Sequence, residues 1–258
     1  MKIIDFKIKK FDQNLDRLLS QRRKKINSSS VSVTKIIKDV KKNGDKALLK
    51  YEKKFNQNSK IKTTSKEVSR LIKLLDKKVK NAIDLAFNRI YKFHSLQKFN
   101  DISYRDKFKN KLEYRYVPIE SVAIYVPGST ASYPSTVLMN AVPAIVAGVK
   151  RIVMINPGLK GRQNPAVLYA AYKCKIKEIY SIGGPSSIAA LTYGTKKIKK
   201  VNKIVGPGNI YVAAAKKEVF GDVGIEGMTA GPSEVTIVCD NFSNPEWMAS
   251  DLIAPAAH

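Results

Sequence analysis

Three glycine-rich turns are the parts of this sequence best suited to chemistry. They read YVPGST at residues 125–130, SIGGPSS at 181–187 and KIVGPGNIYV at 203–212. Each follows a β-rich run and precedes a helical pattern, so each places flexible backbone, with N–H groups available, at the start of a helix. That arrangement binds phosphate or another anion, although an ordinary strand-to-helix turn has the same composition. None of the turns matches the G-x-G-x-x-G dinucleotide fingerprint.

A fourth turn and two histidines are the other candidates for chemistry. The turn MTAGPSEV carries Ser233 and Glu234 directly before a β-rich run, and this pair fits either the start of a strand or a substrate-facing hydroxyl and carboxylate. The chain has 2 histidines, His94 and His258, and no motif gives either a serine or cysteine partner for a nucleophilic triad. His94 and His258 alone supply too few ligands for a zinc site with three or four protein ligands. His94 is expected at the surface, near the end of a helix.

Hydrophobic periodicity predicts the elements that must position these turns. Up to about residue 112 the pattern is helical, with a break at Asn43-Gly44 and a capping box at Thr64–Glu67 that opens a long amphipathic helix to about Gln97. Short β-rich runs then alternate with helical patterns, and strands are predicted at residues 151–155, 176–182, 201–205 and 233–238. This alternation predicts an α/β fold with a parallel sheet covered on both faces. Ligands of such folds gather at the carboxyl ends of the strands.

Composition limits the classes of protein that fit. Lys and Arg total 47 against 21 Asp and Glu, a net charge of +26, which attracts nucleic acid or anionic membranes without specificity. Most lysines are spread over helical repeats without interleaved aromatic residues, so we expect no specific nucleic-acid partner, and a non-specific basic nucleic-acid binder is the alternative from a different class. No export signal or membrane-spanning run is present, which predicts a cytoplasmic protein without membrane contact. Cys174 and Cys239 are predicted to be buried, reduced thiols.

Several blocks of the sequence together resemble the histidinol dehydrogenases. They are YVPGSTASYPSTVLMNAVPAIVAGVKRIVMINP, IGGPSSIAAL followed by YGT, VNKIVGPGNIYVAAAKKEVFG, AGPSEVTIV and WMASDLIAPAAH. The resemblance runs from about residue 15 to residue 258, and GPGN followed by AGPSEV is highly specific. It implies two successive NAD-dependent oxidations, from L-histidinol through an aldehyde to L-histidine, at a zinc-bearing site in a homodimer.

The resemblance also implies a division of the chain. Residues 1–118 would form an N-terminal helical segment of a second, incomplete α/β domain, and residues 119–235 a Rossmann-like NAD-binding domain with a parallel sheet. Residues 236–258 would begin the return into the first domain. Rossmann-like domains of this family lack the common glycine fingerprint, in agreement with the turns described above.

Site residues follow from the resemblance, position by position. Tyr125 of YVPG and Asn209 of GPGN match positions that contact NAD, and Ser186 stands at the cofactor turn where the family has the glutamine of G-G-x-Q. Ser233 of GPSE matches a substrate-contacting serine. His258 matches a histidine that binds zinc and substrate, and a neutral imidazole suits zinc.

The sequence departs from the family pattern at three positions. Ser186 is too short to reach the partner of the family glutamine. Pro255 replaces a zinc-binding glutamine and Ala257 a glutamate, and proline has no side-chain donor or acceptor. The family's catalytic Glu-His pair and further zinc ligands are expected beyond residue 258, so no catalytic residue is assigned here and the 258 residues alone are expected to be inactive. The alternatives are a relative that oxidises another small alcohol, and a residual NAD- or anion-binding fragment.

Overall fold

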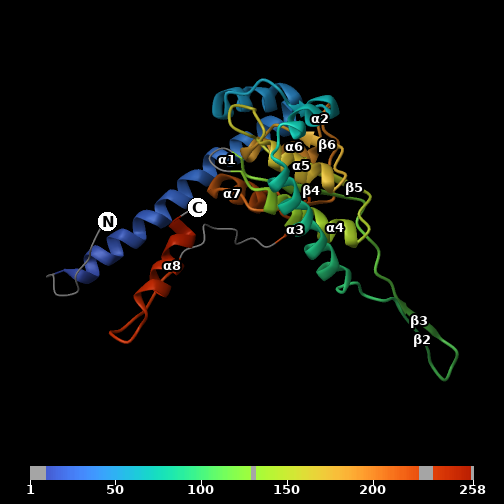
Figure 1. The fold of residues 1–258 in the computed structure, drawn as a ribbon. Helices are drawn as coiled ribbons and strands as arrows, with labels where there is room; N and C mark the ends of the chain where they lie inside the picture. The colour runs from blue at the N-terminus through green and yellow to red at the C-terminus, as the bar shows by residue number, and fades with distance from the viewer. Residues whose placement is uncertain (1–9, 129–131, 227–234, 257–258) are drawn as a thin grey trace.

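A mostly parallel sheet with helices on both faces is the centre of the computed structural model, which describes residues 10–128, 132–226 and 235–256 (Figure 1). Its strands are β1 (Lys62–Thr63), β4 (Ser121–Tyr125), β5 (Arg151–Ile155), β6 (Glu178–Tyr180), β7 (Lys203–Val205) and β8 (Gly224–Ile225). They lie in the order β1-β6-β5-β4-β7-β8, and only β1 pairs antiparallel to its neighbour. The predicted parallel α/β sheet is confirmed.

The helices cover the two faces of this sheet in two groups. They are α1 (Phe11–Asn56), α2 (Ser65–Lys73), α3 (Lys77–Ser95), α4 (Pro134–Val146), α5 (Pro165–Lys173), α6 (Gly184–Tyr193), α7 (Ile210–Glu218) and α8 (Pro245–Ala256). Side chains alternate between faces along β4, so Ala123 and Tyr125 pack with α1, α6 and α7. Ile124 and Val126 pack with α2, α3, α4 and α5 on the other face.

The N-terminal helices belong to this core. Gly44 has φ 53° and ψ −129° inside α1, which confirms the predicted break. Apolar side chains on both sides of that break, from Val33 to Leu48, are buried against α6 and α7. Because β1 also joins the sheet, residues before 118 are tied closely to those after it, and the boundaries at 118 and 235 stay predictions.

The predicted long helix from Thr64 to Gln97 is wrong in one respect. Thr64 does cap the first helix, with its hydroxyl accepting from the Glu67 N–H at 3.3 Å. The chain then breaks between α2 and α3, because the Asp76 carboxylate accepts from the Lys78 N–H at 2.6 Å and starts a new helix. The helical region also ends before residue 112, since β2 (Ile102–Arg105) and β3 (Lys111–Tyr114) form a hairpin that projects from the body (Figure 1).

The strand predicted at residues 233–238 is also wrong where the structure describes it. Residues 235–240 are irregular, and Val238 is 94% exposed. Among the described residues no strand runs beside this segment, so its backbone has no ladder to join. Cys239 in the same segment is exposed, contrary to prediction, whereas Cys174 is buried as predicted and burial raises the pKa of its thiol to about 12. Within the described ranges, no helix combines the length and apolarity needed to cross a bilayer.

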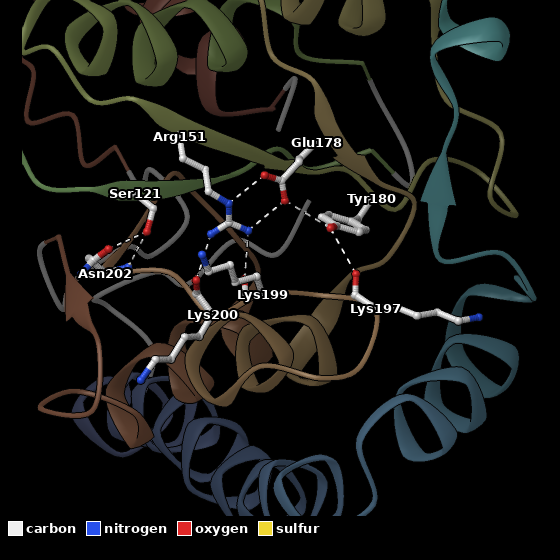
Figure 2. Close-up of polar contacts among 8 residues, drawn as sticks. All are labelled: Ser121, Arg151, Glu178, Tyr180, Lys197, Lys199, Lys200 and Asn202. Atoms are coloured by element: carbon white, nitrogen blue, oxygen red, sulfur yellow. Dashed lines mark hydrogen bonds and ion pairs between the residues drawn. The ribbon is translucent and has the colours of Figure 1, made fainter.

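A polar network secures the edge of the sheet where its strands begin (Figure 2). Arg151 makes a two-pronged ion pair with Glu178, with Nε–Oε1 at 2.7 Å and Nη2–Oε2 at 2.8 Å. Its guanidinium also donates to the carbonyls of Lys199 and Lys200, so one side chain joins β5, β6 and the connection after α6. The hydrogen bonds from Arg151 lower the pKa of Glu178.

Replacing Glu178 tests this network. We expect E178Q to lower the free energy of unfolding by about 1 kcal/mol at neutral pH, as measured by urea denaturation, because the ion pair is partly exposed. The depressed pKa means that the stabilisation is present above the unfolded carboxyl pKa of about 4.3 and is lost as pH falls through the folded value. The difference between wild type and E178Q should therefore shrink in acid.

A matched control is E113Q, which removes two exposed ion pairs at the hairpin, one with Lys111 and one with Arg115. It should change stability by less than about 0.5 kcal/mol. Equal losses in the two variants, or a pH-independent loss in E178Q, would contradict the assigned role.

Candidate functional site

The sheet changes direction beside β4, and the turns that leave β4 and β7 meet there. The chain runs from β4 through β5 to β6 on one side of the sheet and then places β7 on the other side of β4. Gly206 has φ 99° and lies so close to Tyr125 that a Cβ atom would overlap the Tyr125 carbonyl oxygen. Ligands of open α/β sheets bind at this reversal, so the YVPGST and GPGN turns form the candidate site. Residues 129–131 lie outside the described residues.

Asn209 is the last residue of the GPGN turn and caps the N-terminus of α7. Its Oδ1 accepts from the N–H groups of Tyr211 and Val212, both at 3.1 Å, so half of the carboxamide is used as a helix cap. The residue is exposed, and its Nδ2 has no protein acceptor among the described residues. Nδ2 is therefore the group of Asn209 that can donate to a ligand.

Two charged side chains hold the GPGN turn, and periodicity does not single out either of them. Lys216 on α7 is only 4% exposed, and its Nζ donates to the Gly206 carbonyl at 2.5 Å. The Glu226 carboxylate accepts from the Gly206 N–H. Burial lowers the pKa of Lys216, and the charge of Glu226 acts in the opposite direction. The one signal in the sequence is the position of Lys216 among alanines on the apolar side of α7.

Tyr125 connects the site to the second glycine-rich turn. Its ring is packed in the core, with 4% of the residue exposed, and its Oη accepts from the Gly184 N–H at 3.1 Å. Burial raises the pKa of the phenol to about 12, so the group stays protonated at neutral pH. In this arrangement the Tyr125 ring is part of the hydrophobic core, and its contact with NAD stays a prediction.

The SIGGPSS turn differs from the open anion site that its composition suggests. The Gly183 N–H donates to the Glu52 Oε1 at 3.0 Å, and the Gly184 N–H is taken by Tyr125. Ser186 is 3% exposed, and its Oγ lies 3.1 Å from the Gly183 carbonyl oxygen and 3.3 Å from the Glu52 Oε1. The expectation that these glycine N–H groups are available is therefore wrong for this turn, because Glu52 from α1 reaches it. Ser186 as a cofactor contact stays a prediction.

The residues predicted to contact substrate and metal fall outside the part of the chain that the structure describes. Ser233 and His258 lie outside the described residues, as does Ala257. His94 lies in the last turn of α3, where its Nδ1 is 2.5 Å from the Gln97 Oε1, as expected for a surface histidine. In the described part of the chain, no three His, Cys, Asp or Glu side chains gather into a metal site.

The cap made by Asn209 can be tested separately from any ligand contact. We expect N209A to lower the free energy of unfolding by about 1 kcal/mol, because two N–H groups of α7 lose their acceptor. N209D keeps an oxygen at the same place and should stay within a few tenths of a kcal/mol of wild type. Thermal or urea unfolding checks both, and equal stability of N209A and wild type would contradict the capping role.

Comparison with known proteins places these features in a family. The family model described as "Histidinol dehydrogenase" matches residues 19–258. A histidinol dehydrogenase from Pelagibacter ubique (strain HTCC1062) is 78% identical over 258 residues, which is 100% of this chain and 60% of that protein. One from Agrobacterium fabrum (strain C58 / ATCC 33970) is 48% identical over 252 residues, covering 96% of this chain and 58% of the relative.

A solved structure agrees with the sequence matches. The crystal structure of histidinol dehydrogenase from Elizabethkingia anophelis superposes with a TM-score of 0.79 at 41% identity, over 88% of this chain and 53% of that one. The chain thus spans about three fifths of the length of the curated relatives it matches. On the family match and this structural likeness together, the chain belongs to the histidinol dehydrogenase family.

Proposed function

We propose that this chain is part of an enzyme that oxidises L-histidinol through an aldehyde to L-histidine, with NAD as the acceptor of hydride in both steps, in histidine biosynthesis. The observation that carries the proposal is the GPGN turn at the sheet reversal, in a chain that matches the family over residues 19–258. A cytoplasmic location and a homodimer are parts of the same proposal.

The cofactor contacts that we propose differ in kind. Asn209 would bind NAD directly, because its Nδ2 is exposed and has no acceptor within the described structure. Tyr125 and Ser186 are buried and bonded to groups of the SIGGPSS turn, so their part is to shape the wall next to the cofactor. Lys216 and Glu226 would fix the backbone of the turn that Asn209 follows.

The contacts with substrate and zinc are proposed only from the match of single positions to the family pattern. Ser233 and His258 would contact L-histidinol, and His258 would be a zinc ligand. The described residues do not fit a complete zinc site, because they contain no group of three ligands and the side chain of Pro255 has no ligand atom. We therefore derive no step through zinc, and propose that the 258 residues do not catalyse the reaction alone.

Calorimetry tests NAD binding by this chain. We expect wild type to bind NAD and both N209A and N209D to bind about tenfold more weakly, because each removes the exposed amide donor. D76A serves as the control, since it removes a similar helix cap on α3 and should bind NAD as wild type does. Unchanged affinity in N209D would contradict direct contact, and an equal loss in D76A would show a general effect of stability.

Absorbance of NADH tests catalysis. Purified chain mixed with L-histidinol, NAD and zinc should give no turnover above the background without protein, because too few metal ligands are present. Robust, histidinol-dependent formation of NADH would contradict the proposed inactivity of the 258 residues while supporting the proposed reaction.

A further inference from the structure

The two glycine N–H groups that lead into α6 are bound by groups from two other elements. The N–H of Gly183 donates to Glu52 on α1, and the N–H of Gly184 donates to the Tyr125 hydroxyl at the end of β4. Pro185 follows and has no N–H. The first backbone donors of a helix ordinarily lack intrahelical partners and form an anion site. Here both glycine donors already have a partner within the protein.

Glu52 has the surroundings of a bound anion. Its side chain is fully buried, with 0% exposed, and lies among donors. The Oε2 accepts from Asn56 Nδ2 at 2.6 Å and the Oε1 from Gly183, while the Ser186 hydroxyl is within reach. A buried carboxylate is costly unless donors and a favourable field surround it. The positive end of the α6 dipole supplies that field.

Burial without a counter-ion distinguishes Glu52 from the other paired carboxylates. Glu178 lies beside Arg151, and Glu67 beside Lys60, in partly exposed ion pairs. Within the described ranges, Glu52 is bonded to an amide, a backbone N–H and a hydroxyl, and to no lysine or arginine. Burial raises the pKa of the Glu52 carboxyl, and the hydrogen bonds from Gly183, Asn56 and Ser186 act in the opposite direction. The helix terminus therefore offsets part of the cost of burying this charge, where a cation would do so in an ion pair.

We propose that Glu52 is a built-in anion whose carboxylate occupies the anion position at the α6 N-terminus and fixes the SIGGPSS turn. It acts as a positioning residue, because it accepts from the Gly183 N–H and lies within reach of the Ser186 hydroxyl. The adjacent Gly184 N–H donates to the Tyr125 hydroxyl. While these bonds are made, the N–H groups of Gly183 and Gly184 are not available to a phosphate. The anionic part of a cofactor is therefore directed to the turns that follow β4 and β7 at the sheet reversal, and this second consequence rests on the proposed use of NAD.

Chemical rescue tests the built-in anion with the whole 258-residue chain. E52A removes the carboxylate and leaves space that formate can fill, whereas E52Q removes the charge and keeps the space occupied. E67A is the matched control, because Glu67 lies in the first turn of another helix, α2, but is partly exposed. Each protein is refolded in sodium formate or in sodium chloride of equal ionic strength, and its thermal midpoint is measured.

We expect E52A and E52Q to unfold at lower temperatures than wild type in chloride. Formate should raise the midpoint of E52A by about 3 °C more than it raises that of wild type, since a bound ion stabilises only the folded state. E52Q and E67A should respond to formate as wild type does, because E52Q has no vacant position and E67A opens none in the core.

Two results would overturn the proposal. One is an E52A midpoint that formate raises no more than that of wild type, and the other is an E52Q midpoint equal to that of wild type, since either shows that Glu52 only fills space. If E52A does not fold in chloride, circular dichroism gives the folded fraction after refolding. A larger folded fraction in formate supports the built-in anion, and equal failure in both salts contradicts it. None of these readouts involves NAD, so failure of the proposed reaction would not alter them.

Discussion

The close approach of Gly206 to the backbone of Tyr125 is the constraint on which the candidate site depends. A left-handed φ and the overlap that any Cβ would cause leave glycine as the residue that fits. This contact brings the turn after β7 against the end of β4, at the point where the sheet reverses. Lys216 and Glu226 then hold the two polar groups of the Gly206 backbone, and Asn209 begins α7 immediately afterwards.

Two glycine-rich turns of similar composition have different roles because of distant residues. The GPGN turn keeps an exposed amide at Asn209, whereas the SIGGPSS turn has its glycine donors occupied by Glu52 and Tyr125. Glu52 lies 131 residues before Gly183, so its proximity depends on the packing of α1 against α6. Local composition therefore predicts where an anion site can form, and tertiary contacts decide whether it is open.

Periodicity predicts the parts of the fold that depend on local pattern. The strand at 151–155, the helices after the glycine turns and the break at Gly44 all follow from apolar spacing and glycine position. The break at Asp76 and the irregular segment at 235–240 do not, because one depends on a side-chain cap and the other on the lack of a neighbouring strand in the described structure. The buried charge of Glu52 resembles that of an ordinary surface residue in sequence, and Lys216 differs from one only by its place among alanines, so packing reveals both.

The anionic part of the cofactor is expected at the turns that follow β4 and β7 and not at the glycine N–H groups of the α6 turn. Hydrogen–deuterium exchange with and without NAD tests it directly, because bound ligand slows exchange of the backbone N–H groups that it covers. Slower exchange in peptides that span residues 203–212, larger than any change across residues 181–187, is the predicted result. Protection confined to residues 181–187 would contradict the claim, since it would place the cofactor at the turn that Glu52 fills.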